Sequence, residues 1–106
     1  MLLSNNLDKL PLEKIPDFCR RWQVNEFCLF GSVLSDNFGS KSDVDVMVQF
    51  DPAACPTFSC LDQMELELKE LFSREIDLIT RKGIEVSRNY LRRNQILSSV
   101  KVVYAA

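Results

Sequence analysis

One segment of the chain, residues 43–50, constrains the fold more than any other. It reads Asp-Val-Asp-Val-Met-Val-Gln-Phe, beginning with strict alternation of aspartate and valine and continuing as a mostly apolar run. Alternate residues of a strand point to the same face, and a mostly apolar run is typical of a strand that is covered on both sides. The segment therefore predicts a central strand on which Asp43 and Asp45 project to the same side.

The rest of the chain alternates between helical and strand-like patterns. Apolar residues at helical spacing predict helices over 11–22, 61–72 and 84–99. Short apolar or alternating runs predict strands over 26–30, 75–80 and 100–104, and the last of these could instead be the frayed end of the preceding helix. The connecting segments are a short turn or helix over 33–38, a loop over 51–59, and a break at Gly83 that ends the strand over 75–80. This order predicts an α/β or α+β fold, with a small mixed sheet flanked by helices.

Composition limits the size of the fold and the chemistry that it can perform. With 106 residues, 46% of them hydrophobic and 26% charged, the chain is expected to form a single domain over 1–106. There is no histidine, which excludes Ser-His-Asp and Cys-His nucleophiles, an imidazole base and His-bearing zinc sites. The three glycines are too scattered for a dinucleotide-binding turn or a phosphate loop. Catalysis must therefore use carboxylates, Lys, Tyr, Ser or Cys.

The cysteines and the charge distribution indicate the compartment and the partners. The four cysteines lack metal-binding spacing, and the chain begins without a signal-peptide pattern, so we expect reduced thiols in a cytoplasmic protein, with Cys19 and Cys28 buried. No apolar run has the ~20 residues that a membrane span needs. Acidic residues dominate 1–80 and basic residues dominate 81–106, and the net charge of -2 argues against direct nucleic-acid binding.

Three arginines stand out in the basic C-terminal part, namely Arg88, Arg92 and Arg93. A cluster of this kind can mark a site for an anionic partner. It can equally be the solvated face of a helix. The sequence leaves these alternatives open.

A set of candidate site residues surrounds the predicted central strand. Gly31 and Ser32 directly follow the strand predicted over 26–30, and a turn into a helix there would point backbone N–H groups at one spot, which suits phosphate oxygens. Asp77 lies between two apolar residues of another predicted strand, so it joins Asp43 and Asp45 if the two strands are neighbours.

Carboxylates placed so closely repel one another and favour a cation between them. Lys41 is the nearby basic residue in the sequence, and one or two hard divalent cations, Mg²⁺ by preference, suit an all-oxygen site. Three aspartates beside a phosphate-binding turn describe a two-metal site for phosphoryl or nucleotidyl transfer. In this interpretation Asp43 and Asp45 hold both ions, Asp77 holds the ion that carries the nucleophile and can accept its proton, and the turn holds the triphosphate.

Each candidate residue also has a purely structural interpretation. Asp43 could cap a turn, Asp45 could face water on an edge strand, and Asp77 could pair with Arg74 or Arg81. The Gly-Ser pair could likewise be an ordinary turn. The order and spacing of the four elements together favour the site.

The run Phe30-Gly31-Ser32, ten further residues, Asp43-x-Asp45 and a later Asp77 resembles the nucleotidyltransferase signature of the polymerase-β superfamily. Nearly the whole chain is similar to the minimal nucleotidyltransferase (MNT) domain proteins of prokaryotes, and the similarity is carried by the stretches 18–22, 29–34, 42–46, 76–80 and 88–106. The resemblance implies that the three aspartates bind Mg²⁺ and that Gly31 and Ser32 bind the nucleotide triphosphate.

The resemblance also implies a partner. MNT proteins are commonly antitoxins of HEPN-domain ribonuclease toxins, and members transfer AMP from ATP to a tyrosine of that toxin, so a hetero-oligomer with such a toxin is expected. Many relatives carry Arg soon after the Gly-Ser pair, whereas Val33 and Leu34 follow it here, which favours a binding-only antitoxin as a second hypothesis. A transferase acting on a small hydroxylated molecule is a third hypothesis, disfavoured because such enzymes usually have a further helical domain.

Overall fold

The computed structural model describes residues 10–34, 42–54 and 56–106, except for the side chain of Ser32. The described elements follow one another along the chain, and η denotes a 3₁₀ helix. They are η1 (Leu12–Lys14), α2 (Ile15–Trp22), β1 (Val24–Phe30), η2 (Gly31–Leu34), β2 (Val44–Phe50), α3 (Phe58–Phe72), β3 (Ile76–Thr80), α4 (Arg81–Glu85), α5 (Tyr90–Ser99) and β4 (Lys101–Ala105). The predicted alternation of helices and strands is confirmed.

The strands form a mixed four-stranded sheet in the order β3-β2-β1-β4. β1 runs antiparallel to both of its neighbours, whereas β2 and β3 are parallel. β2 therefore lies inside the sheet, as the pattern of residues 43–50 predicts. β4 confirms the strand interpretation of the last predicted segment.

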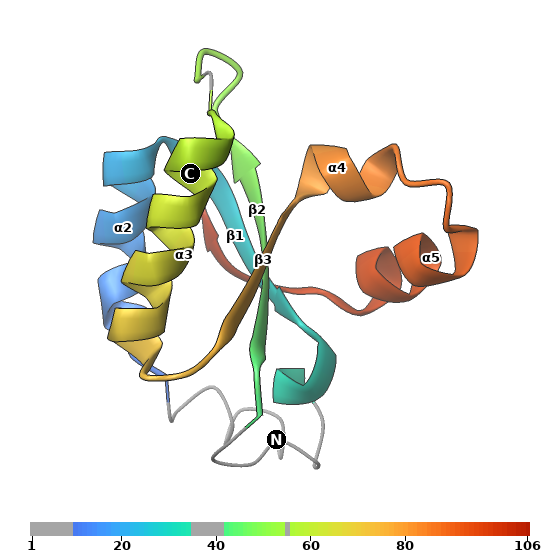
Figure 1. Ribbon diagram of the computed structural model, residues 1–106, viewed down its shortest axis with the longest axis horizontal. Coiled ribbons are helices and arrows are strands. Elements are labelled where there is room, and N and C mark those ends of the chain that lie inside the picture. Colours follow the sequence, from blue (N-terminus) through green and yellow to red (C-terminus); the bar gives the residue numbers. More distant parts are fainter. Residues whose placement is uncertain (1–9, 35–41, 55) are drawn as a thin grey trace.

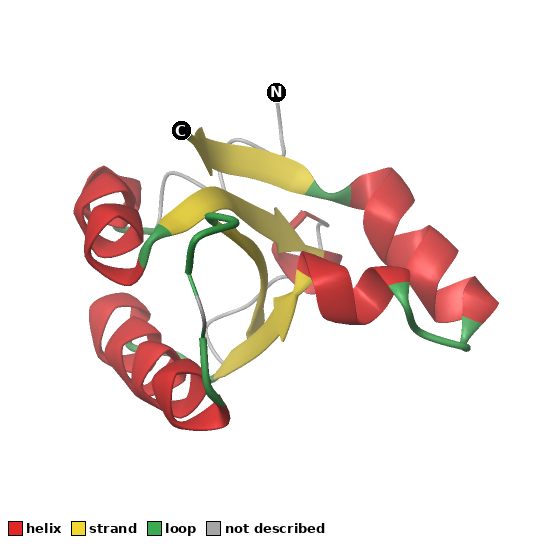
Figure 2. Ribbon diagram, turned by 90° about the horizontal axis from the view of Figure 1, so that it is seen from above, coloured by secondary structure: helices red, strands yellow, loops and turns green. Residues whose placement is uncertain are grey.

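Helices cover both faces of this sheet. α2 and α3 lie side by side on one face, and α4 and α5 lie on the other (Figures 1 and 2). The α2/α3 face holds the larger hydrophobic cluster, in which the Phe18 ring packs edge-on against Phe27 at 6.0 Å between centroids. The α4/α5 face holds a smaller cluster, consisting of Cys28, Phe30, Met47, Ile84 and Ile96. Most of the apolar burial, and hence most of the stabilisation by burial, lies on the α2/α3 side.

The start of α3 depends on a side-chain cap. The Thr57 hydroxyl accepts a hydrogen bond from the Cys60 N–H at 3.1 Å, which satisfies one of the free donors of the first turn. The helix consequently begins at Phe58, three residues before the predicted start at 61. Its buried residues Met64, Leu68 and Phe72 follow at helical spacing.

The C-terminal region differs from the prediction. The helix predicted over 84–99 is two helices, because Asn89 begins a new one by accepting a hydrogen bond from the Arg92 N–H at 3.1 Å. The prediction that Gly83 ends the preceding strand is also wrong. β3 ends at Thr80, whose hydroxyl caps α4 by accepting a hydrogen bond from the Gly83 N–H at 3.0 Å, so that Gly83 lies inside this helix.

Two other predicted features are adjusted or fall outside the description. β1 begins at Val24 rather than at residue 26. The turn or helix predicted over 33–38 begins as η2, while residues 35–41, including Lys41, lie outside the described residues. Within the described residues, none of the helices combines the length and apolar character needed to cross a membrane.

Candidate active site

Asp45 and Asp77 are direct neighbours on the two parallel strands β2 and β3. Residues paired in this way point to the same side of a sheet. The valines beside Asp45 belong to the α2/α3 cluster, whereas Met47, two residues further on, belongs to the α4/α5 cluster. Both carboxylates therefore lie on the α4/α5 face, and the predicted adjacency of the two strands is confirmed.

Gly31 brings the end of β1 against the Asp45 carboxylate. Its φ of +78° lies in the left-handed region, which L side chains rarely adopt. A Cβ placed on Gly31 would lie 2.1 Å from Asp45 Oδ2, far inside contact distance. Only glycine satisfies both conditions, so the turn at Gly31 and the Asp45 side chain form one compact unit.

A pocket of about 260 Å³ opens beside this unit. Its lining comes from the end of β1, from the two aspartates and from one side of α5, and it consists of Phe30, Gly31, Asp45, Asp77, Arg92, Gln95, Ile96 and Ser99. The four residues from α5 follow the pattern i, i+3, i+4 and i+7, which is the spacing of one helical face. The sequence alone predicts neither Gln95 nor Ser99 as a site residue and leaves the role of Arg92 open, although it shows these three residues at helical spacing.

The charges in the pocket are unbalanced. Burial raises the pKa of the Asp45 carboxyl above its ordinary value, and the negative charges of Asp77 and Asp43 raise it further. Arg92 acts in the opposite direction and lowers this pKa. A cation bound beside Asp45 and Asp77 would relieve their repulsion.

Asp43 lies one residue before β2 and is exposed. It lies close enough to Asp45 to act on its charge, but it is outside the pocket lining. Two hydrogen bonds hold the chain here: the Val44 N–H donates to the Glu75 carbonyl at 2.9 Å, and Arg74 donates to the Ser42 carbonyl at 2.9 Å. The start of β2 is thereby fixed to the segment that leads into β3.

The other predicted elements are placed only in part. The backbone of Ser32 belongs to η2, and its side chain lies outside the described residues. The structural alternative for Asp45 is wrong in one respect, because its strand is internal rather than an edge. Arg81, one predicted partner of Asp77, instead forms ion pairs with Glu26 and Glu85.

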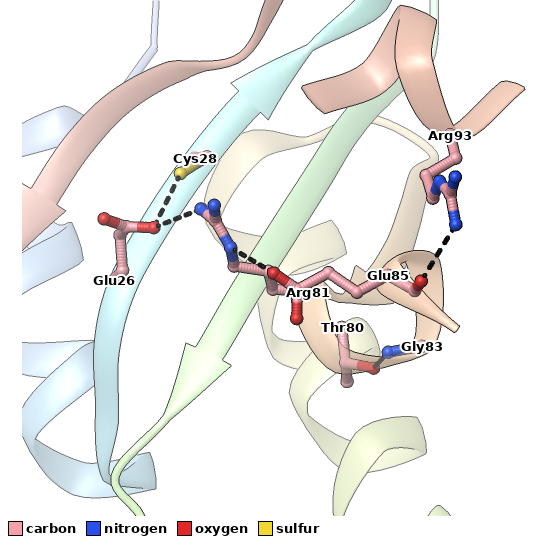
Figure 3. Close-up of polar contacts among 7 residues, drawn as sticks. All are labelled: Glu26, Cys28, Thr80, Arg81, Gly83, Glu85 and Arg93. Atoms are coloured by element: carbon pink, nitrogen blue, oxygen red, sulfur yellow. Dashed lines mark hydrogen bonds and ion pairs between the residues drawn. The ribbon is translucent and has the colours of Figure 1, made fainter. Parts of the chain in front are cut away.

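The ion pair between Arg81 and Glu26 links α4 to the sheet, and a hydrogen bond from Arg93 links α5 to α4. Arg81 bonds Glu26 of β1 at 3.2 Å and Glu85 of α4 at 3.1 Å, and Arg93 of α5 donates to the Glu85 carbonyl at 3.3 Å (Figure 3). The Cys28 thiol lies 3.7 Å from the Glu26 carboxylate. Burial and the negative charge of Glu26 raise the pKa of this thiol to about 11, so Cys28 is a poor nucleophile at neutral pH.

The donor set of the pocket fits magnesium. No three acidic or thiol side chains of the described residues are arranged as a ready-made metal site. Mg²⁺ typically keeps several waters and binds through one or two carboxylates together with substrate phosphates. The neighbouring pair Asp45 and Asp77, with Asp43 at the start of the strand, suits that mode of binding.

Paired aspartates of a mixed sheet, beside a glycine turn and lining one small pocket, are an arrangement suited to binding a metal–nucleotide complex. The family described as nucleotidyltransferase domain matches residues 12–103, which is most of the chain. The chain therefore belongs to the nucleotidyltransferase domain family.

Individual relatives are similar to parts of the chain. A Methanocaldococcus jannaschii protein, provisionally named a protein adenylyltransferase, is 34% identical over 64 residues. That match covers 60% of this chain and 64% of the relative, so the chain spans less than two thirds of the relative's length.

Two solved structures share the fold. A chain of a toxin–antitoxin crystal structure with AMP-PNP superposes with a TM-score of 0.70 at 19% identity, covering 92% of this chain and 75% of that one. A chain in the structure of a tri-AMPylated Shewanella oneidensis HEPN toxin in complex with an MNT antitoxin gives 0.61 at 18% identity, covering 98% and 73%. The predicted nucleotidyltransferase-like fold is confirmed.

Proposed function

We propose that the chain is an Mg²⁺-dependent nucleotidyltransferase that transfers AMP from ATP to a tyrosine of a partner HEPN toxin and so acts as its antitoxin. The observation that carries this proposal is the register pairing of Asp45 with Asp77 against the turn at Gly31, inside one pocket. Membership of the nucleotidyltransferase domain family supports the reaction class.

Each residue has a role in this reaction. Asp45 and Asp43 would hold both metal ions, and Asp77 would help to hold the ion that carries the nucleophile and would take up the proton of the acceptor hydroxyl. Gly31 and Ser32 bind the triphosphate. Bound Mg²⁺ would neutralise the phosphate charge and lower the pKa of the acceptor hydroxyl. The acceptor oxygen forms a bond to the α-phosphorus, the bond between that phosphorus and the bridging oxygen breaks, and pyrophosphate leaves.

Two observations support a protein acceptor. Solved structures of this fold include an AMPylated HEPN toxin in complex with an MNT antitoxin. In addition, three large apolar side chains are exposed on the segment that carries α4 and α5, whose helix α5 also lines the pocket: Val86 is 72% exposed, Tyr90 65% and Leu91 79%. Exposed apolar groups concentrated beside a site are typical of protein contact surfaces.

The test is transfer of AMP to the protein encoded beside this chain, which we expect to be a HEPN-domain toxin. Intact-mass measurement of the co-expressed partner, with ATP and Mg²⁺, is expected to show the addition of one or more AMP groups. Asp45→Asn and Asp77→Asn are expected to abolish the addition. Asp62→Asn, an equal change in charge at an exposed position of α3, is the matched control. An unmodified partner with the parent chain would refute the proposed reaction.

A second candidate is a binding-only antitoxin that blocks the toxin by covering it. It is favoured by the two residues after the glycine turn, since Val33 is fully buried and Leu34 packs against the same cluster, which leaves neither position for a phosphate-binding cation. Neutralisation of the toxin that survives Asp45→Asn would support this candidate over catalysis.

A further inference from the structure

The glycine turn lacks a cation of its own at the next two positions. Val33 is buried at 0% exposure and Leu34 packs on the α2/α3 cluster, so both side chains serve the core. A nucleotide triphosphate carries several negative charges, and protein sites for it generally add Arg or Lys to the metal ions. The proposed function therefore calls for a cation from elsewhere in the fold.

Arg92 of α5 is the basic residue among the described side chains that line the pocket. It lines the pocket together with Asp45 and Asp77, and its positive charge acts on Asp45. Among the described residues, its guanidinium forms no ion pair or side-chain hydrogen bond. Arg93, the next residue, is engaged instead, since it bonds the Glu85 carbonyl and lies 4.8 Å from the centre of the Tyr90 ring.

The backbone around Arg92 is well fixed. Its N–H donates to the side chain of Asn89, which caps α5 at the first turn. Ile96, one turn later, is buried in the cluster on this side of the sheet, so the same helical face is turned toward the pocket. The contact of Arg93 with Glu85 holds the start of the helix against α4. Arg92 thus carries an exposed charged group on a backbone that is held in place.

We propose that Arg92 binds the β- or γ-phosphate of the nucleotide, supplying from α5 the cation that is absent after the glycine turn. Gln95 lies on the same helical face and is a further hydrogen-bonding group for the nucleotide, whereas the Ser99 hydroxyl already donates to the Gln95 carbonyl at 2.6 Å. Without nucleotide, Arg92 offsets the charge of Asp45. With nucleotide, Asp45 is neutralised by the metal ion, and Arg92 turns to the phosphates. This inference rests on the proposed function, because it assumes that ATP occupies the pocket.

Calorimetric titration of the full chain with ATP, and separately with adenosine, tests the inference. The variants are Arg92→Ala, Arg92→Gln and Arg92→Lys, and the control is Arg88→Ala, which removes the same charge from an exposed residue outside the pocket lining. Loss of a charge-assisted contact to phosphate is expected to weaken ATP binding by about 10-fold to 100-fold in the Ala and Gln variants. Lys restores part of the affinity, and adenosine binding stays unchanged.

The titrations repeated in EDTA add an independent readout. Without metal ions, ATP binding depends more strongly on Arg92, and Asp45→Asn is expected to strengthen it, because the substitution removes a negative charge that repels phosphate and attracts the guanidinium. With Mg²⁺ the same substitution weakens ATP binding. A larger effect of Arg92→Gln in EDTA than in Mg²⁺ separates a phosphate-binding arginine from one that merely supports the fold.

The possible failures are distinguishable. If the parent chain binds no ATP with or without Mg²⁺, the proposed function fails. If the parent binds ATP and the Arg92 variants bind it equally well, the inference about Arg92 fails while the function stands. Equal weakening by Arg88→Ala, or equal weakening of adenosine binding, would also overturn the inference, since the effect would then be general charge or altered structure. Circular dichroism of each variant confirms that it is folded.

Discussion

Replacing Gly31 by alanine tests the packing of the glycine turn against Asp45. The left-handed backbone at φ +78° costs a non-glycine residue about 1–2 kcal/mol. The added Cβ would also lie 2.1 Å from Asp45 Oδ2, so the carboxylate or the strand must move, at a cost of about 1–3 kcal/mol. We expect Gly31→Ala to lower the free energy of unfolding by about 2–5 kcal/mol, measured by urea denaturation followed by circular dichroism.

A double-mutant cycle separates the two contributions. Asp45→Ala removes the atom that the new methyl group meets, and the remaining Asp45 Cβ lies at an ordinary 3.5 Å. In that background Gly31→Ala is expected to cost only the left-handed part, about 1–2 kcal/mol. Gly83→Ala is the control, since a gain in helix propensity of about 1 kcal/mol offsets the close approach to the Thr80 hydroxyl. An equal cost of Gly31→Ala in both backgrounds would refute the steric argument.

Three further predictions concern other parts of the molecule. Hydrogen bonds from Arg21 lower the pKa of Glu67 below its ordinary 4.5, so the ionised carboxylate stabilises the fold above that pH and the contribution is lost on acidification. Glu67→Gln should therefore have a lower melting temperature than the parent at pH 7, and the difference should vanish in melting curves recorded at acidic pH. Thr57→Ala removes the cap of α3 and should lower the free energy of unfolding, measured in urea, by about 1 kcal/mol. It should also raise the pKa of the Cys60 thiol, which the Thr57 hydrogen bond lowers, and so slow the alkylation of this thiol at a given pH. Asp45→Asn should raise the melting temperature without metal by relieving like-charge repulsion and abolish the stabilisation by Mg²⁺ with ATP, in a thermal-shift assay.

The central part of the fold and the core of the site could be predicted from the sequence because their signals are local. The alternating start of β2 predicts its place inside the sheet, which the structure confirms, and the common side of Asp43 and Asp45 stays a prediction. The sequence predicts that Asp77 joins Asp45 only if their strands are neighbours, and the structure pairs the two strands in parallel with these residues side by side. The catalytic and metal-binding roles of these residues stay predictions.

The C-terminal part was harder to predict because its signals depend on the fold around them. Residues 84–99 keep a helical apolar pattern across the break, and the capping role of Asn89 shows only once its side chain is seen to accept the Arg92 N–H. Arg92, Gln95 and Ser99 have a visible helical spacing, yet nothing local indicates that this face meets Asp45. That contact is produced by the crossing of α5 over the sheet.

Strand β1 holds both ends of the segment that forms the outer wall of the pocket. Before α5, Arg81 of α4 is paired with Glu26 of β1, and after α5, the strand β4 is paired along β1. Displacing α5 outward thus requires either rupture of that ion pair or unzipping of the terminal strand. The position of α5 at the pocket is therefore set by residues outside the pocket lining, and weakening the Glu26–Arg81 pair should loosen this helix without changing any side chain that lines the pocket.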